Sequence, residues 1–283
     1  MEIYNIGDFN VPVYLIGTHN NWTIIEGGIS YQTNSALTKL KKIVQDLDSV
    51  QNWIILHAHY DHYGLLPYLF SYFKNIKIWV GEKTFNKFKD LQKIHEDEDL
   101  NKKLSEVASY TLPKSTYYPV NEISYSILSE HKSYDFSKDL CFNVIKTPGH
   151  SSCSISIFEK NNGFLFVSDA LGGFNKDKTI IPLFFQDIRL YLSSIQKIQE
   201  IDSSSILLGH KYPPFCTAKK TVDNSLNSTV KFIDNIKEKL KTVTKETLVE
   251  QLVNTYFHYD ESFIIKSLYV KSFNRIVDLI HEY

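Results

Sequence analysis

Arginine is nearly missing from this chain of 283 residues, which contains only Arg189 and Arg275. Lysine and arginine together number 31 against 32 acidic residues, so the net charge is -1. This balance lacks the excess positive charge of a nucleic-acid-binding protein, and we expect no nucleic acid partner. The planar guanidinium is the side chain that clamps phosphate with two hydrogen bonds. With so little of it, an anionic substrate group must be met mainly by lysines or by helix N-termini.

Disulfide frameworks and long apolar segments are also lacking. The three cysteines, Cys141, Cys153 and Cys216, are odd in number and form no CxxC pair, which fits a reducing compartment. No apolar run approaches the roughly 18 residues that a membrane span needs. Residues 1–17 show neither the basic start nor the apolar core of a signal peptide. We therefore expect a cytoplasmic protein with no membrane partner.

The apolar pattern predicts an α/β protein built from two β-rich blocks and a helical tail. At 43% hydrophobic residues, the chain can form one large core or a core with a smaller appended unit. Strands are expected at 11–17, 22–28, 52–56, 76–80, 122–128, 140–149, 154–160, 163–170 and 205–210. Helices are expected at 36–47, 64–73, 82–110 and 187–201, and from 219 to 283 with divisions near 243 and 259. Two αβ halves facing each other, with a helical appendage, would satisfy this layout.

The segment HAHYDH, residues 57–62, crowds metal-binding side chains into one turn. His57 and His59 project to the same side if the preceding strand continues. Asp61 and His62 follow where the strand gives way to a helix. Imidazole and carboxylate together suit zinc, iron or manganese. The alternative is two core histidines with Asp61 as a helix N-cap.

Three further residues of the same chemical types follow apolar runs later in the chain. They are His150 after KTPG, Asp169 after FVS and His210 after LLG. Each alone is more often a structural turn residue. Strand ends at the rim of an αβ sandwich are where a site is exposed, so their joint occurrence after HAHYDH favours a metal site. Seven ligands are enough for two metals and a bridge.

This pattern resembles the metallo-β-lactamase superfold over roughly residues 10–215. The resemblance implies an αββα sandwich spanning residues 1–215 and a C-terminal helical segment, 216–283, that acts as a lid or in dimerisation. It implies two divalent metal ions (zinc, iron or manganese), each held by three residues. By the family pattern, the first metal is held by His57, His59 and His150. The second is held by Asp61, His62 and His210, with Asp169 bridging both.

The expected chemistry is hydrolysis. Two divalent ions beside one water lower its pKa and make hydroxide available near neutral pH. The same ions stabilise the oxyanion that forms when a bridging hydroxide attacks a carbonyl. Asp61 and Asp169 are the candidate catalytic carboxylates. Asp61 can also orient the hydroxide or move its proton.

A closer resemblance covers nearly the whole chain in short stretches: VPVYLI, IIEGGIS, HAHYDHYGLLPYL, SDALGGF and the tail SLYVKSFNRIVDLI. These are similar to the 2-aminobenzoylacetyl-coenzyme A thioesterases of alkylquinolone quorum-sensing signal biosynthesis. The resemblance implies hydrolysis of an acyl thioester of coenzyme A or of a carrier protein, in signal or secondary-metabolite biosynthesis. It departs at Gly173 and Ser267, where that family has acidic residues, so the acyl group is expected to differ. The alternatives are a glyoxalase II-like or lactone hydrolase with the same metals, or a mainly regulatory binding protein.

The substrate pocket is expected between the tail and the loop after Pro182. Leu268, Tyr269 and Ser272 are the candidates for one wall, with Phe184 and its neighbour Phe185 opposite. The apolar spacing of the tail also fits plain core packing. Its exposed face offers a surface for a homodimer.

Overall fold

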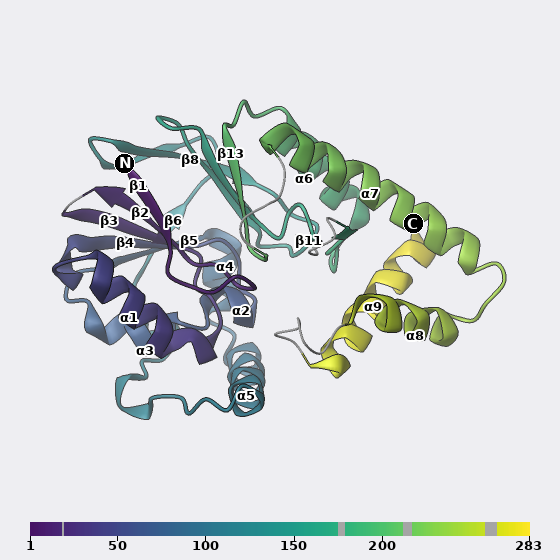
Figure 1. The fold of residues 1–283 in the computed structure, drawn as a ribbon, viewed down its shortest axis with the longest axis horizontal. Helices are drawn as coiled ribbons and strands as arrows, with labels where there is room; N and C mark the ends of the chain where they lie inside the picture. The colour runs from purple at the N-terminus through teal and green to yellow at the C-terminus, as the bar shows by residue number, and fades with distance from the viewer. Residues whose placement is uncertain (19, 175–178, 212–216, 258–264) are drawn as a thin grey trace.

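Two β-sheets lie face to face, with helices on their outer sides (Figure 1). The computed structural model describes residues 1–283 apart from 19, 175–178, 212–216 and 258–264. This is the expected αββα sandwich with a C-terminal helical extension, so the predicted fold class is confirmed. Across the described parts of the chain, no helix combines the length and the apolarity needed to cross a membrane.

Each half of the chain supplies one sheet. The first sheet has the order β1 (Glu2–Asn5), β2 (Tyr14–Thr18), β3 (Asn21–Ile25), β4 (Val50–Ile55), β5 (Lys77–Gly81), β6 (Tyr125–Leu128). The second has the order β13 (Ser205–Leu208), β10 (Phe164–Ser168), β9 (Ile155–Glu159), β8 (Leu140–Lys146), β7 (Ser133–Ser137). Strands β3 to β6 are mutually parallel, as are β10 and β13. A small hairpin, β11 (Gly173–Phe174) with β12 (Ile180–Ile181), stands apart.

Helices cover both outer faces. On the first half these are α1 (Thr33–Ile43), α2 (Tyr60–Tyr63), α3 (Leu66–Leu69), α4 (Glu82–Lys87) and α5 (Leu91–Val107). On the second half they are α6 (Ile188–Gln199) and α7 (Ala218–Lys239). Helices α8 (Lys245–Tyr256) and α9 (Lys266–Glu282) lie beyond the sheet, where they pack against each other and α9 also packs against α7 (Figure 1).

The second half of strand β4, residues 53–55, is apolar throughout because both of its faces are buried. Ile54 faces the second sheet and packs in the layer that contains Phe142. Trp53 and Ile55 point the other way, into the cluster beneath the first-half helices. Successive strand residues face opposite sides, and both sides are buried here, so the usual polar alternation is absent. His57 therefore emerges from a strand that is held rigidly on both faces.

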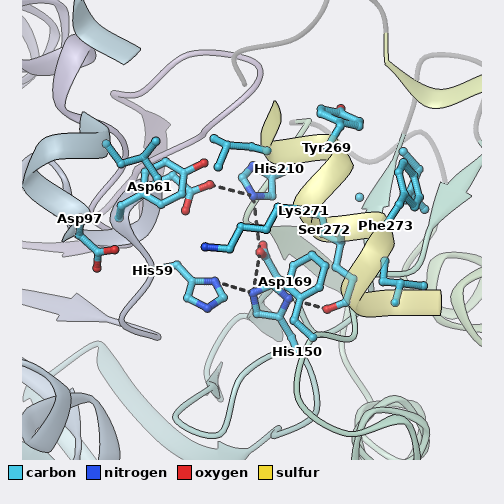
Figure 2. A pocket seen from close by; sticks show the side chains of 18 of the residues that line it. His59, Asp61, Asp97, His150, Asp169, His210, Tyr269, Lys271, Ser272 and Phe273 are labelled. Atoms are coloured by element: carbon cyan, nitrogen blue, oxygen red, sulfur yellow. Dashed lines mark hydrogen bonds and ion pairs between the residues drawn. The ribbon is translucent and has the colours of Figure 1, made fainter. Parts of the chain in front are cut away.

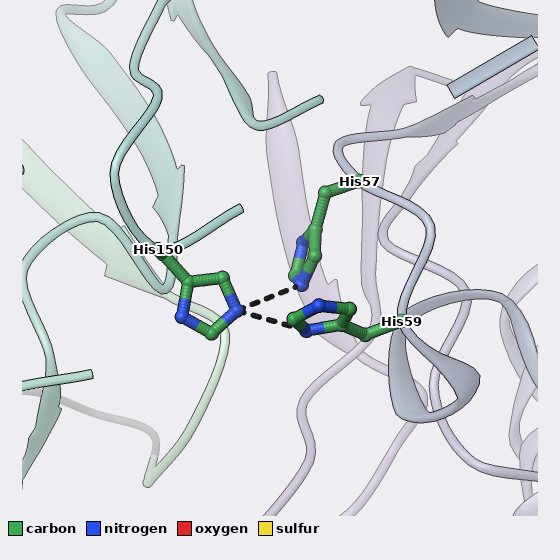
Figure 3. A group of neighbouring side chains, drawn as sticks. All are labelled: His57, His59 and His150. Atoms are coloured by element: carbon green, nitrogen blue, oxygen red, sulfur yellow. Dashed lines mark hydrogen bonds between the residues drawn. The ribbon is translucent and has the colours of Figure 1, made fainter. Parts of the chain in front are cut away.

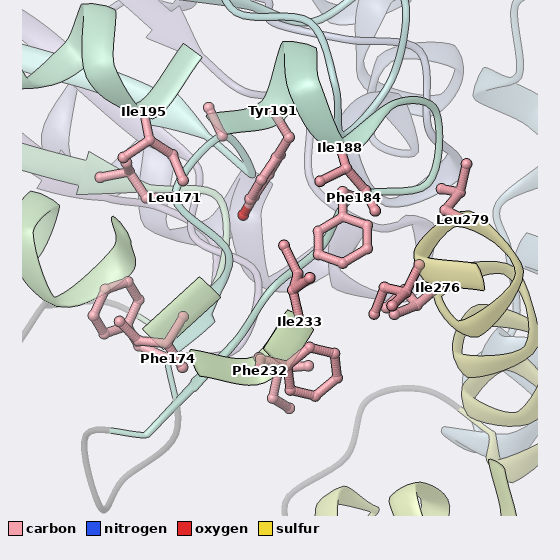
Figure 4. Packing of buried hydrophobic residues seen from close by; sticks show 14 of the residues in the cluster. Leu171, Phe174, Phe184, Ile188, Tyr191, Ile195, Phe232, Ile233, Ile276 and Leu279 are labelled. Carbon is pink, nitrogen blue, oxygen red and sulfur yellow. The ribbon is translucent and has the colours of Figure 1, made fainter. Parts of the chain in front are cut away.

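The C-terminal helices share a core with the second half (Figure 4). Phe184 before α6, Ile233 of α7 and Ile276 of α9 belong to one buried cluster that also includes residues of β10 and β13. The helical tail is divided as the sequence suggests, first between Lys239 and Lys245 and again after Tyr256. The proposed boundary at 215 falls on 212–216, outside the described residues, and stays a prediction.

Several elements differ from their predictions. The helix expected at 64–73 is broken into α3 and a 3₁₀ turn at Phe70–Tyr72. Strand β3 stops at Ile25 because Glu26 has a left-handed backbone with φ of 70°. Strands β1 and β7 were not predicted, since both are short and none of their residues is fully buried.

Candidate metal centre

The seven predicted ligands lie at the carboxyl ends of strands from both sheets. His57 follows β4, Asp169 follows β10 directly, and His210 comes two residues after β13. His150 follows β8, on a turn that begins with Gly149. The structure brings all seven side chains together, although they are separated by up to 153 positions in the sequence.

Three histidines form the first set (Figure 3). His150 Nε2 lies 3.2 Å from His57 Nε2 and 2.9 Å from His59 Nδ1. One ligand atom from each residue lies within 4.8 Å of the others, as a shared ion requires. Two of these rings come from the first half and one from the second.

Asp61, His62 and His210 form the second set. His62 Nε2 lies 3.3 Å from His210 Nε2, which in turn is 3.7 Å from a carboxylate oxygen of Asp61. These ligand atoms also lie within 4.8 Å of one another. The grouping again joins the two halves of the chain.

Asp169 lies between the two sets (Figure 2). Its Oδ2 is 3.2 Å from His150 Nε2, 3.4 Å from His62 Nε2 and 3.5 Å from His210 Nε2. Its other oxygen is buried and has no hydrogen-bond partner among the described residues. A buried carboxylate oxygen without a partner is costly, and a cation would satisfy it.

For three of these histidines, the partner of the outer nitrogen shows which ring nitrogen is free to bind an ion. Oxygen acceptors lie at the Nδ1 atoms of His150 (Leu183 O, 2.6 Å), His210 (Asn10 O, 3.1 Å) and His62 (Glu26 Oε2, 3.2 Å). A carbonyl or carboxylate only accepts, so the outer nitrogen of a neutral ring holds the hydrogen. The inner Nε2 then presents its lone pair, which is the arrangement that metal-binding histidines use. The donor set therefore fits divalent cations.

Burial and charge affect the two sets differently. Burial, together with the neighbouring rings, lowers the pKa of His57 and His59 well below the usual range. Burial also acts to lower the pKa of His62, but Asp169 and Glu26 raise it well above the usual range. Burial favours protonation of Asp169, yet the surrounding histidines hold its pKa well below normal. His57 and His59 of the first set therefore favour the neutral form, whereas the carboxylates around His62 in the second set favour positive charge there.

Close packing at the centre restricts the backbone. A Cβ at Gly209 would lie 2.5 Å from Asp169 Oδ1 and 2.7 Å from His62 Cε1. Ser168, whose hydroxyl is 3.1 Å from His57 Nδ1, has a left-handed backbone with φ of 50°. Strained non-glycine residues of this kind cluster at functional sites.

The centre opens into a cavity of about 280 Å³ (Figure 2). Its lining includes His59, Asp61, His150, Asp169 and His210 from the centre. Helix α9 supplies Leu268, Tyr269 and Ser272, the three tail residues proposed from the sequence, and also Lys271, Phe273 and Ile276.

Phe184 does not line this cavity. Its side chain is fully buried in the core shared with α6 and α9. The adjacent Phe185 lines the cavity instead, with its ring centroid 5.2 Å from that of His150. Both residues lie in the loop before α6, and the sequence alone does not show which of two adjacent aromatic side chains faces the site.

Sequence reasoning missed Glu26 and the lysines of the cavity wall, Lys93, Lys211 and Lys271. Glu26 carried a usable signal, because it follows the apolar run WTII just as the ligands follow theirs. The lysines had none, since they resemble the many other lysines of the chain.

A family model described as the metallo-beta-lactamase superfamily matches residues 6–210. The chain belongs to this superfamily. Two solved members match almost the whole chain and share its fold. The superfamily protein from Sulfolobus tokodaii is 16% identical with a TM-score of 0.62, covering 100% of this chain and 98% of its own. The family protein from Thermus thermophilus is 13% identical with a TM-score of 0.67, covering 99% and 93%.

At the sequence level, the chain is similar to hydroxyacylglutathione hydrolase 1 of Vibrio vulnificus (strain YJ016). It is 28% identical over 141 residues, which are 49% of this chain and 55% of the relative. The chain therefore spans about half the length of this superfamily relative.

Proposed function

We propose that this superfamily member hydrolyses acyl thioesters with two divalent metal ions. One observation carries the proposal: two histidine-containing sets, joined by Asp169, present inward lone pairs at the end of a cavity with apolar walls. His57, His59 and His150 would hold one ion, and Asp61, His62 and His210 the other. The donors are nitrogen and oxygen only, so zinc, iron and manganese all suit them.

Divalent ions bound there would make a water acidic enough to ionise near pH 7 and would polarise the substrate carbonyl. The chain's own residues would do the rest. The Asp61 carboxylate, which lines the cavity, would orient the water and accept its proton. Apolar side chains of α9 and Phe185 hold the acyl group and exclude bulk water. The thiolate can leave without being protonated by a dedicated acid, because the pKa of a thiol is about 8.5.

A glutathione thioester is the second candidate substrate. The superfamily relative from Vibrio vulnificus is named for hydrolysis of hydroxyacylglutathione, which is also a thioester. The chemistry at the carbonyl is the same for both candidates, and the thiol half differs.

The test is a substrate panel with protein loaded in turn with zinc, iron or manganese. Thiol release is followed for aryl, β-keto and aliphatic acyl-coenzyme A, and for S-lactoylglutathione, with lactone opening measured in parallel. We expect turnover of coenzyme A thioesters that falls at least a thousand-fold in Asp169→Asn, because loss of one carboxylate disrupts both sets. Circular dichroism checks that the variant folds. Turnover of lactones alone, or none with both metals bound, would refute the thioesterase proposal.

A further inference from the structure

Lysines and carboxylates are equal in number in the cavity wall before any metal is considered. Lys93, Lys211 and Lys271 line it, against Asp97 and the two carboxylates of the centre, Asp61 and Asp169. Bound divalent ions would turn this balance into an excess of positive charge. A narrow cavity of this sign favours an anion, because field lines concentrate where the walls exclude water.

Two of these lysines are engaged with the protein. Lys93 forms an ion pair with Asp97, a buried residue whose other oxygen accepts a hydrogen bond of 2.9 Å from Tyr63. Lys211 donates to the side-chain oxygen of Asn10 at 2.7 Å. The Asp97 carboxylate therefore balances one of the three charges.

Lys271 is different. Figure 2 shows its side chain extending from α9 into the cavity, towards the side where His59 lies. No hydrogen bond or ion pair joins its ammonium to any residue that the structure describes. Tyr269, Phe273 and Ile276, also from α9, line the same cavity and are mainly apolar. Lys271 itself is exposed, so its ammonium can be reached by a carboxylate ligand and can form a charge-assisted hydrogen bond with it.

The size of the cavity indicates which part of a thioester brings that carboxylate. At about 280 Å³ it is slightly smaller than the usual ligand pocket, which measures roughly 300 to 1,000 Å³. It holds a short acyl chain and leaves no room for the nucleotide of coenzyme A. We infer that the substrate's acyl group ends in a carboxylate and that Lys271 binds it, while the thioester carbonyl lies at the metal centre. This inference rests on the proposed function.

The first test measures binding and needs no turnover. Glutarate and its isostere glutaramate each offer one carboxylate to the metal centre, and only glutarate has a second. Calorimetry on metal-loaded protein is expected to show glutarate binding about ten- to a hundred-fold more tightly. In Lys271→Gln the difference should disappear. In Lys266→Gln, a control on the same helix outside the cavity lining, it should remain.

The second test measures specificity. The ratio of kcat/KM for glutaryl-coenzyme A to that for its methyl ester should exceed ten and fall about tenfold or more in Lys271→Gln. Because the coenzyme A part is identical, its phosphates cancel from the ratio.

The two tests separate this inference from the proposed function. A glutarate preference that depends on Lys271 in a protein without thioesterase activity would support the carboxylate site and refute the proposed reaction. Thioesterase activity with no carboxylate preference would overturn the inference alone. A Lys271-dependent preference for acetylglutathione over acetyl-coenzyme A, with glutaryl-coenzyme A and its methyl ester equal, would also overturn it, because the anion would then belong to the thiol.

Discussion

Glu26 shows how much one side chain outside the ligand sets can do. The residue is 1% exposed, and Oε2 accepts from His62 Nδ1 while the backbone carbonyl accepts from the Trp53 indole at 2.9 Å. It does this in a left-handed backbone conformation that non-glycine residues rarely adopt. The residue thus sets the orientation and tautomer of His62 from the end of β3.

We expect Glu26→Gln to weaken metal binding at the second set by about ten- to a hundred-fold, because a neutral amide replaces the charged acceptor of His62. Competition with a chromophoric chelator measures the affinity. The matched control is Glu159→Gln, an equally buried carboxylate at the far end of β9 that caps the turn at Asn161. The control should lower stability and leave metal affinity intact; equal affinity losses in the two variants would contradict the role given to Glu26.

At the level of elements, the turn between β8 and β9, which packs against α6, positions His150. Gly149 has φ of 125°, and a Cβ there would lie 2.3 Å from the Tyr191 backbone of α6. The carbonyl of Gly149 also accepts from Gln186 N at 3.0 Å, which holds the Phe185 segment against His150. A side chain at position 149 would therefore prevent the turn from packing this closely against helix α6.

Gly149→Ala is expected to lower the free energy of unfolding by about 2–4 kcal/mol, because it adds a clash to a strained backbone. Urea denaturation measures the loss. Gly173→Ala is the control: its new Cβ would meet only Leu183 Cδ1, at 3.7 Å, which is ordinary contact. A difference of less than about 1 kcal/mol between the two variants would show that α6 can move aside.

The elements that were predictable from the sequence are those with a strong apolar pattern. Strand β4 and helices α6 to α9 follow from such patterns, and the ligands follow from their place at strand ends. Strand β7 was missed because its five residues, SYDFS, offer only two apolar positions, Tyr134 and Phe136, which is too short an alternation to stand out. The exchange of Phe184 for Phe185 could not be predicted either, since the direction of a side chain in a loop depends on its neighbours in space.

At the scale of the whole molecule, each set of candidate ligands draws on both halves. His57 and His59 come from the first sheet and His150 from the second; Asp61 and His62 likewise face His210. Ions bound there would fasten one half to the other. Binding to the native state alone adds about 2.7 kcal/mol at a metal concentration a hundred times Kd.

Chelation should therefore lower Tm, and added zinc should restore it in proportion to the logarithm of its concentration. Scanning calorimetry on chelated and zinc-loaded protein measures the shift. His150→Ala, which removes one ligand of the first set, should reduce the zinc-dependent rise, while His95→Ala, on the exposed face of α5, should keep it in full. A rise that survives His150→Ala unchanged would place the stabilising zinc elsewhere.

The division of the ligands between the two halves also sets an order of events during translation. When the ribosome has made HAHYDH, neither set has all its members. The histidine set becomes available only once His150 has left the exit tunnel, and the second set only once His210, at position 210 of the 283 residues, has left it too. A nascent chain that captures metal too early would have to use the wrong partners, so correct loading has to wait until both sheets have formed.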